Sequence, residues 1–230
     1  MGIKCVTFDL DDTLWSIWPV IERAENVFHQ WMGEHLPRIA DTYSVDDLTA
    51  HRHAFFLDNP DLHHDLTSLR KLWMTGLARD HDYPEHLVDK GFNVFWKERN
   101  SVDLFDHVHD VLPHVSSRYL SGAITNGNAD IHHIGIGDYF HFYLKSADVG
   151  KAKPHPDIFQ SALDHANCSP EQMVHVGDDP VTDIQGAANL GIRTVWVNIL
   201  DREWQGNHKP DAQISSLSQL PAVLDNLEFE

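Results

Sequence analysis

The chain has few basic residues for its length. Its 230 residues include 17 lysines and arginines against 35 aspartates and glutamates, and the formal net charge is -18 with neutral histidines. A protein that follows the phosphates of a nucleic acid normally carries the opposite balance, and anionic membrane surfaces also attract basic segments. We therefore expect neither a nucleic-acid partner nor a membrane partner.

Long apolar runs and cysteines are also scarce. No apolar stretch approaches the roughly 20 residues that span a bilayer, and the first residues do not show the basic and then apolar segments of a secretory signal. The only cysteines, Cys5 and Cys168, are interpreted as reduced structural thiols. These features predict a cytoplasmic protein.

An apolar segment near the start ends in a group of carboxylates. Val6 and Phe8 suit a buried strand, and Asp9 and Asp11 follow it, with Thr13 after them. Residues two apart on an extended chain share a face, so these three polar side chains are expected to project together if the extended backbone continues. Neighbouring carboxylates repel one another and are costly to desolvate without a cation. The segment therefore predicts a site for a hard divalent ion, Mg²⁺ above all.

Two patterns follow this segment. Over residues 15–100 apolar side chains recur at helical spacing and no strand is expected, which indicates an all-helical insertion. From residue 101 helices alternate with short apolar strands, which is typical of a parallel sheet. We predict an α/β fold with a Rossmann-like, doubly wound parallel sheet. Residues 1–14 and 101–230 would form this domain, with the helical domain inserted after its first strand.

Several helix boundaries are predicted from local signals. Ser44 with Asp47 has the spacing of a capping box at the start of one helix. Another helix is expected over residues 62–79. Asn128 and Asp179 are expected to cap the helices that follow them.

Four polar loops carry the chemistry. They span residues 9–13, 125–128, 151–154 and 177–183, and a doubly wound sheet brings such loops to one edge. An aspartate can attack phosphorus, and a second carboxylate can protonate the leaving oxygen and later activate water. A metal and a lysine neutralise charge on the transferring group, while a threonine hydroxyl and backbone N–H groups hold phosphate oxygens. The loops together predict phosphoryl transfer.

The four loops, in this order, resemble the motifs of haloacid dehalogenase (HAD) superfamily phosphatases, and the resemblance covers essentially the whole chain. The motifs are D-x-D-x-T from Asp9, T-N-G-N from Thr125, K-P from Lys153 and G-D-D-x-x-x-D from Gly177. By this resemblance the helical insertion is a cap domain of the family's first cap class. In a dehalogenase of the family the first aspartate attacks a carbon atom and the second acid is absent. The presence of Asp11 therefore favours reaction at phosphate over reaction at a carbon–halogen bond.

The resemblance also implies individual roles. Asp9 would be the nucleophile and Asp11 the general acid and base. Asp9, the main-chain carbonyl of Asp11, and Asp178 would hold Mg²⁺. The remaining implied residues bind phosphate (Thr125, Asn126 and Lys153) or support these groups from behind (Asp183 and Asp179).

Some residues have two interpretations. Lys151 competes with Lys153 for the phosphate, and we favour Lys153 because a residue before proline is held extended. Asp12 is expected to point away from Asp9 and to bond locally, and Asp179 to act mainly as a helix cap. Trp15 either packs at the hinge or stacks on a flat substrate ring.

The inserted domain offers few candidates for specificity. His64, Arg70 and Lys71, together with His63, are placed on the helix expected over residues 62–79. They form either a solvated face or contacts to the leaving group of the substrate. His175 is interpreted as a core residue.

A closer resemblance concerns the substrate. The runs at residues 123–128, 137–140 and 175–179 resemble bacterial phosphatases of riboflavin biosynthesis, which act on 5-amino-6-(5-phospho-D-ribitylamino)uracil and on flavin mononucleotide. We therefore expect a small phosphate ester as substrate and no protein partner. The alternatives are a sugar-phosphate or nucleotide phosphatase, a phosphomutase, a receiver-like domain and a non-enzymatic binding protein.

Overall fold

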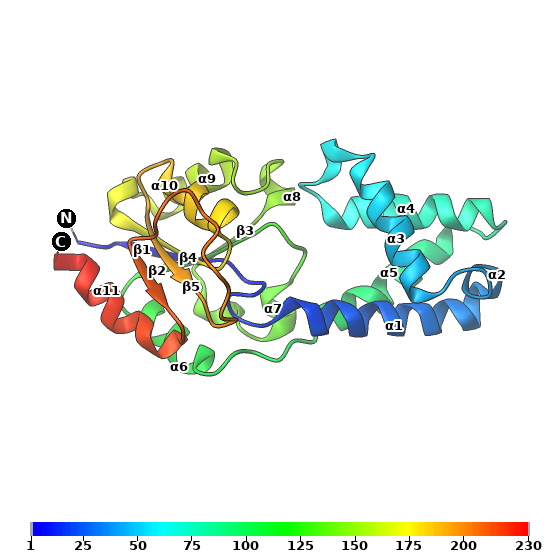
Figure 1. The fold of residues 1–230 in the computed structure, drawn as a ribbon, viewed down its shortest axis with the longest axis horizontal. Helices are drawn as coiled ribbons and strands as arrows, with labels where there is room; N and C mark the ends of the chain where they lie inside the picture. Colours follow the sequence, from blue (N-terminus) through cyan, green and yellow to red (C-terminus); the bar gives the residue numbers. More distant parts are fainter. Residues whose placement is uncertain (1, 230) are drawn as a thin grey trace. The chain divides into compact units, whose positions relative to one another are not determined.

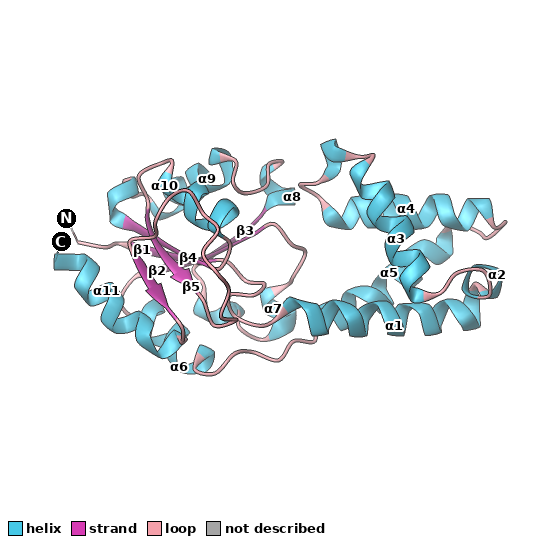
Figure 2. Ribbon diagram, viewed as in Figure 1, coloured by secondary structure: helices cyan, strands magenta, loops and turns pink. Residues whose placement is uncertain are grey.

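The chain divides into two compact units, which we describe separately. The computed structural model describes residues 2–229 (Figure 1). One unit consists of Met1–Ser16 with Asp103–Glu230, and the other of Ile17–Val102. The first unit mixes helices and strands, and the second contains no strand, as Figure 2 shows. Their assignment to a catalytic core and a cap is a functional statement and stays a prediction.

A sheet of six parallel strands lies at the centre of the first unit. Its order is β3-β2-β1-β4-β5-β6, so the chain returns to the middle of the sheet and reverses direction beside β1. This confirms the predicted doubly wound sheet, in which ligands bind where the strand order reverses. The strands are β1 (Cys5–Phe8), β2 (Leu120–Thr125), β3 (Phe142–Lys145), β4 (Met173–Gly177), β5 (Arg193–Val197) and β6 (Ala212–Ile214).

Helices cover both faces of this sheet. In Figure 1, α9 and α10 lie on one face, and α6 and α11 lie on the other. All four residues of β1 are buried as a result, which explains why the strand shows no alternation of buried and exposed positions. The helices of this unit are α6 (Val108–Ser116), α7 (Ile131–Ile134), α8 (Ser146–Val149), α9 (Pro156–Ala166), α10 (Gly186–Ala188) and α11 (Leu220–Phe229), with a π-helical turn at Pro180–Gln185.

The second unit is held together by an apolar core between its helices. Phe28 and Met32 of one helix meet Trp73, Phe92 and Phe95 of two others. None of the helices in the described part of the chain is long and apolar enough to span a membrane. The helices of this unit are α1 (Ile17–His35), α2 (Pro37–Ala40), α3 (Val45–Leu57), α4 (Leu66–Asp80) and α5 (His86–Arg99).

A charged group is buried within this apolar core. The Glu25 carboxylate accepts hydrogen bonds from Arg52 and from Arg70, whose Nη2 lies 2.5 Å from Glu25 Oε1. The Arg70 guanidinium also lies 3.4 Å from the centre of the Phe95 ring. Burial lowers the pKa of both arginines to about 9, because removal from water disfavours their charge. One carboxylate therefore links α1, α3 and α4.

The capping signals were partly right. The capping box of Ser44 and Asp47 opens α3, and Asp179 accepts hydrogen bonds from two N–H groups at the start of the next helical turn. The cap predicted at Asn128 is wrong, because α7 begins at Ile131 and Asp130 accepts its first N–H groups.

One further helix was predicted with the wrong start, and one strand was not predicted. The helix expected over residues 62–79 begins only at Leu66, because Asp65 caps it and Pro60–Leu62 forms a separate 3₁₀ turn. The strand β6 was not predicted, since a three-residue segment with a polar centre carries no recognisable period.

Glu25 gives a direct test of the buried charge. We expect Glu25→Gln to lower the free energy of unfolding by about 3–5 kcal/mol, because it leaves the buried Arg70 and the partly buried Arg52 without a counter-charge. Urea unfolding of the full chain measures this, with Glu22→Gln at an exposed position of the same helix as the control. Equal stability of the two variants would show that the buried cluster does not support this unit.

Candidate active site

The chain turns sharply after β1. Strand pairing continues only to Asp9, whose N–H donates to Val176 O at 2.9 Å, and Asp12 then adopts a left-handed φ of 57°. Aspartate is one of the residues that tolerate this region. The expectation of an extended backbone through Thr13 is therefore wrong. The polar side chains diverge to four partners: Asp9 to Lys153, Asp11 to Trp15, Asp12 to Arg202 and Thr13 to Asp178.

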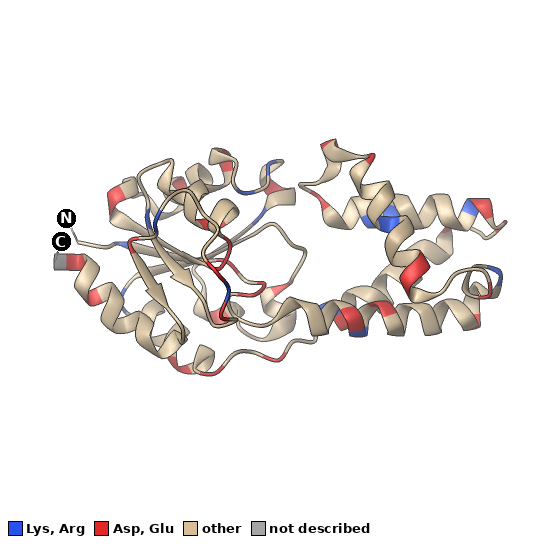
Figure 3. Cartoon of the chain, viewed as in Figure 1, with Lys and Arg blue, Asp and Glu red and all other residues tan. Residues whose placement is uncertain are grey.

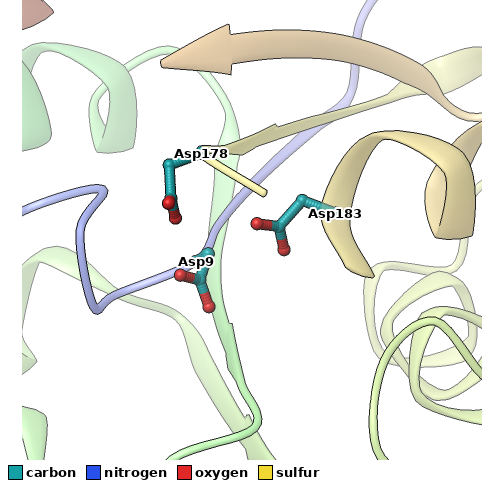
Figure 4. A group of neighbouring side chains, drawn as sticks. All are labelled: Asp9, Asp178 and Asp183. Carbon is teal, nitrogen blue, oxygen red and sulfur yellow. The ribbon is translucent and has the colours of Figure 1, made fainter. Parts of the chain in front are cut away.

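Three carboxylates converge where β1 and β4 end. Figure 4 shows Asp9, Asp178 and Asp183 pointing toward one another. One carboxylate oxygen of each residue lies within 4.8 Å of those of the other two. Their exposed fractions are only 8 %, 7 % and 1 %. Acidic positions occur throughout both units (Figure 3), so burial rather than acidity distinguishes this cluster.

A buried lysine lies among these acids. Lys153 Nζ is 2.5 Å from Asp9 Oδ1, 2.6 Å from Asp183 Oδ1 and 3.0 Å from the Ile124 carbonyl oxygen. Its side chain is 2 % exposed, whereas Lys151 lies at an exposed position. Lys153 is therefore the lysine of this loop that belongs to the cluster.

Burial and charge pull the pKa values in opposite directions. Burial raises the pKa of Asp9, the Lys153 charge opposes this shift, and the charges of Asp183 and Asp178 add to it. Burial, with the charges of Asp183 and Asp12, raises the pKa of Asp178 to about 7. Burial would lower the pKa of Lys153, but its two carboxylate partners outweigh this effect and hold the pKa above its usual value. The ammonium group therefore stays charged.

Asp183 is the most heavily bonded member of the cluster. Besides Lys153, its Oδ1 contacts His175 Nε2 at 3.1 Å, and its Oδ2 accepts from the Asp179 N–H at 3.0 Å. A side chain at Gly177 would place its Cβ 2.4 Å from the Asp183 carboxyl carbon. A glycine is therefore required where β4 ends, since Asp183 packs directly against the strand.

The predicted phosphate-binding loop after β2 lies beside this group. Thr125 is buried, and its Oγ1 accepts from the Gly127 N–H at 2.9 Å. The Asn126 amide bonds twice to the main chain of Lys153: its Nδ2 donates to the carbonyl oxygen at 2.9 Å, and its Oδ1 accepts from the N–H at 2.7 Å. Asn126 therefore fixes the loop that carries Lys153.

Asp11 and Trp15 form a pair. The indole Nε1 donates to Asp11 Oδ1 at 2.9 Å, and Trp15 is 0 % exposed. A buried indole favours the packing interpretation of Trp15 over stacking on a substrate ring. The Asp11 carboxylate is not a member of the three-acid cluster, although the prediction assigned its main-chain carbonyl rather than its carboxylate to the metal.

The other specificity candidates lie in the helical unit. Arg70 is buried against Glu25, which favours a structural role, and Lys71 Nζ forms an ion pair with Asp89 Oδ1 at 2.8 Å. His64 precedes α4 rather than lying on it. A role of these three residues toward the substrate stays a prediction.

Sequence reasoning missed one residue of the cluster, Arg202. It lies on the loop between β5 and β6, and its two terminal nitrogens donate to Asp178 Oδ2 at 2.7 Å and to Asp12 Oδ2 at 2.6 Å. The partner of Asp12 is therefore remote in sequence rather than local. No motif surrounds Arg202, so only the folded chain reveals this contact.

The donor set fits a hard divalent cation. Buried carboxylate oxygens from two adjacent strand ends are the ligand type that Mg²⁺ prefers. Asp9 and Asp178 are the predicted ligands. Asp183 is the more heavily bonded acid, because it accepts from Lys153, His175 and the Asp179 N–H, whereas Asp178 accepts one bond on each oxygen. Thr13 Oγ1 donates to Asp178 Oδ1 at 3.2 Å and orients that carboxylate.

The chain is similar to known phosphatases. The chain is 31 % identical to the 5-amino-6-(5-phospho-D-ribitylamino)uracil phosphatase YigB of Escherichia coli (strain K12), over 96 % of each protein. It is 28 % identical to the glyceraldehyde 3-phosphate phosphatase of Pyrococcus furiosus, over 97 % of this chain and 93 % of that one.

A solved structure is also similar. The structure described as a 2-haloacid dehalogenase from Pseudomonas syringae pv. Tomato DC3000 superposes with a TM-score of 0.91 at 38 % identity, covering 97 % of this chain and 99 % of the other. The family model for haloacid dehalogenase-like hydrolases matches residues 3–191. With this match, and with relatives along its whole length, the chain belongs to the haloacid dehalogenase-like hydrolase family.

Proposed function

We propose that the chain is a Mg²⁺-dependent phosphomonoesterase that acts through an aspartyl-phosphate on Asp9. The observation that carries this proposal is the buried ammonium group of Lys153, held between Asp9 and Asp183. A fixed positive charge beside a nucleophile stabilises the negative charge of a transferring phosphoryl group. The phosphatases among the relatives support the same reaction class.

The reaction would have two halves. In the first, an Asp9 oxygen forms a bond to phosphorus while the bond from phosphorus to the leaving oxygen breaks, and Asp11 gives that oxygen a proton. In the second, Asp11 takes a proton from water, whose oxygen bonds to phosphorus as the bond to Asp9 breaks. Phosphate leaves, and both carboxyl groups return to their starting protonation states.

Asp11 would have to change partner during this cycle. Its carboxylate accepts from the Trp15 indole, whereas proton transfer requires contact with the leaving oxygen. We propose that the Asp11 side chain exchanges the indole for the substrate. Trp15 then holds the resting position of the acid rather than the substrate.

Phosphate binding would fall to Lys153 and Thr125. Asn126 would act through Lys153, because its amide bonds to the main chain of that residue. Mg²⁺ would be held by Asp9, Asp178 and the main-chain carbonyl of Asp11, and when bound it neutralises charge on the phosphoryl oxygens. Asp183 would hold Lys153 in place, and Asp179 would support Asp183 through its main-chain N–H.

The substrate proposal rests on the relatives and on the helical unit. We propose a small cytoplasmic phosphate ester, with 5-amino-6-(5-phospho-D-ribitylamino)uracil first and flavin mononucleotide second, because the YigB phosphatase is similar over 96 % of each chain. The unit Ile17–Val102 would act as the cap that selects the leaving group. His64 and Lys71 are its candidate contacts.

Dehalogenation is the second candidate function. The 38 % identity to the Pseudomonas syringae protein favours it. A carbon-centred reaction at Asp9 would release halide and would not need Asp11 to protonate an alkoxide. The presence of this second acid beside the nucleophile is why we rank phosphate chemistry first.

The first test concerns the nucleophile. Asp9→Asn is expected to lower kcat for a generic aryl phosphate by at least about 10³-fold, because an amide oxygen is a far poorer nucleophile than a carboxylate. Steady-state phosphate release measures this, with Asp138→Asn at an exposed position as the control. Turnover retained by Asp9→Asn with an intact fold would rule out the mechanism.

The cation dependence is a separate prediction. A chelator is expected to stop phosphate release and Mg²⁺ to restore it, and Asp178→Asn is expected to weaken Mg²⁺ binding because it removes a charged ligand. Calorimetric titration of each variant with Mg²⁺ measures the affinity. Asp138→Asn, at an exposed position outside the site, is the control. Equal affinity in the two variants would contradict the assignment of Asp178.

A substrate panel separates the two candidate functions. Phosphorylated metabolites, including the uracil precursor and flavin mononucleotide, are incubated with the enzyme alongside 2-haloacids, and free phosphate and free halide are measured. We expect phosphate release with the highest kcat/KM on the uracil precursor. Halide release without phosphate release would replace the phosphatase proposal. An isomeric phosphate ester formed without free phosphate would indicate a mutase.

A further inference from the structure

Two buried polar residues behind the candidate site have no role in the reaction described above. Thr7 on β1 and His175 on β4 are register partners, and both are 0 % exposed. They lie on the sheet face covered by α9, where the Phe159 ring meets the imidazole edge-on at 5.2 Å. An apolar pair would be the ordinary choice for such a position.

Both imidazole nitrogens have partners. Nδ1 lies 2.9 Å from Thr7 Oγ1, and Nε2 lies 3.1 Å from Asp183 Oδ1. A buried imidazole is costly unless both nitrogens are hydrogen-bonded, so the two contacts explain how the ring is tolerated. They also connect the interior of the sheet to the carboxylate that holds Lys153.

The donor chemistry assigns the tautomer of the ring. Asp183 beside the Lys153 ammonium is ionised and only accepts, so Nε2 must carry a proton. Burial lowers the pKa of His175, which keeps the ring neutral despite the opposing pull of Asp183. Nδ1 of a neutral ring then accepts, and Thr7 donates to it. The Val174 carbonyl oxygen, a second acceptor near this hydroxyl, is 3.5 Å away.

The position of the ammonium depends on this arrangement. Asp183 is held by the imidazole and by the Asp179 N–H, and it faces Lys153 Nζ at 2.6 Å. Lys153 in turn lies 2.5 Å from Asp9. A shift of Asp183 would therefore move the positive charge away from the nucleophile.

We propose that Thr7 and His175 are positioning residues, which hold Asp183, and through it Lys153, in place against Asp9. Thr7 donates to Nδ1 and holds the ring, the ring donates to Asp183, and the carboxylate fixes the ammonium group. The hydrogen bonds follow from the contacts described above, whereas their effect on the reaction rate rests on the proposed function.

Nuclear magnetic resonance tests the hydrogen bonds from Thr7 to Asp183 without an activity measurement. In protein labelled with ¹⁵N at histidine, the His175 signals are identified by their loss in His175→Gln. We expect hydrogen on Nε2 in the unaltered protein, in Thr7→Ser and in Thr7→Val, because the Asp183 carboxylate requires a donor there. In Thr7→Val, but not in Thr7→Ser, the Nδ1 signal is expected to shift to that of an imidazole nitrogen without a hydrogen bond. A proton on Nδ1 in the unaltered protein, or an unchanged Nδ1 signal in Thr7→Val, would overturn the proposal.

Kinetics test the consequence. Thr7→Val is expected to lower kcat for an aryl phosphate about 10-fold with little change in KM, as for other groups that orient catalytic residues, and Thr7→Ser to restore it. Ser121→Ala is the matched control, because Ser121 Oγ also contacts a histidine Nδ1, that of His141 at 2.9 Å, on another strand. Unchanged kcat in Thr7→Val, or an equal loss in Ser121→Ala, would overturn the proposal.

A double substitution makes the test sharper. The amide of His175→Gln can donate to Asp183 without help from Thr7, so Thr7→Val should cost less than about 2-fold in that background. If the losses in kcat of the two substitutions are fully additive, Thr7 does not act through His175. If the unaltered protein has no phosphatase activity, the proposed function fails, while the resonance experiment still decides the positioning proposal.

Discussion

A single buried positive charge makes the candidate site possible. Without Lys153, the carboxylates of Asp9 and Asp183 would be buried side by side with no counter-charge, and such groups are costly to desolvate. Lys153 offsets this cost and at the same time stands beside the proposed nucleophile. Stability and chemistry thus depend on the same ion pairs, since a change that removes the ammonium would harm both.

The parallel sheet brings these charges together. Asp9 follows β1, Asp178 follows β4, and these two strands pair directly, so the acids lie at the same edge although they are 169 positions apart in the sequence. The loop that carries Lys153 is fastened to the neighbouring strand end by Asn126. Helices on both faces keep water away from the strands. A buried charge without a partner would therefore be costly in free energy.

The sequence predicted the fold class and most of the residues that meet in the cluster, because motifs at strand ends follow directly from parallel topology. It failed where tertiary contacts decide the outcome. The left-handed conformation of Asp12 breaks the extended pattern on which Asp9 and Thr13 were expected to align. Arg202 has no motif around it. His175 is buried, as predicted, but its contacts with Thr7 and Asp183 depend on the strand register, which the sequence does not reveal.

Trapping the covalent intermediate tests the central claim most directly. Asp11→Asn should slow the release of the phosphoryl group from Asp9 more than its transfer from an aryl phosphate, because an aryl leaving group needs less help from an acid. The variant is mixed with the ester, quenched in acid and digested, and the peptide that contains Asp9 is examined by mass spectrometry. We predict a mass increase of one phosphoryl group on Asp9. An unmodified Asp9 peptide, together with phosphate release by the unaltered enzyme, would contradict the account.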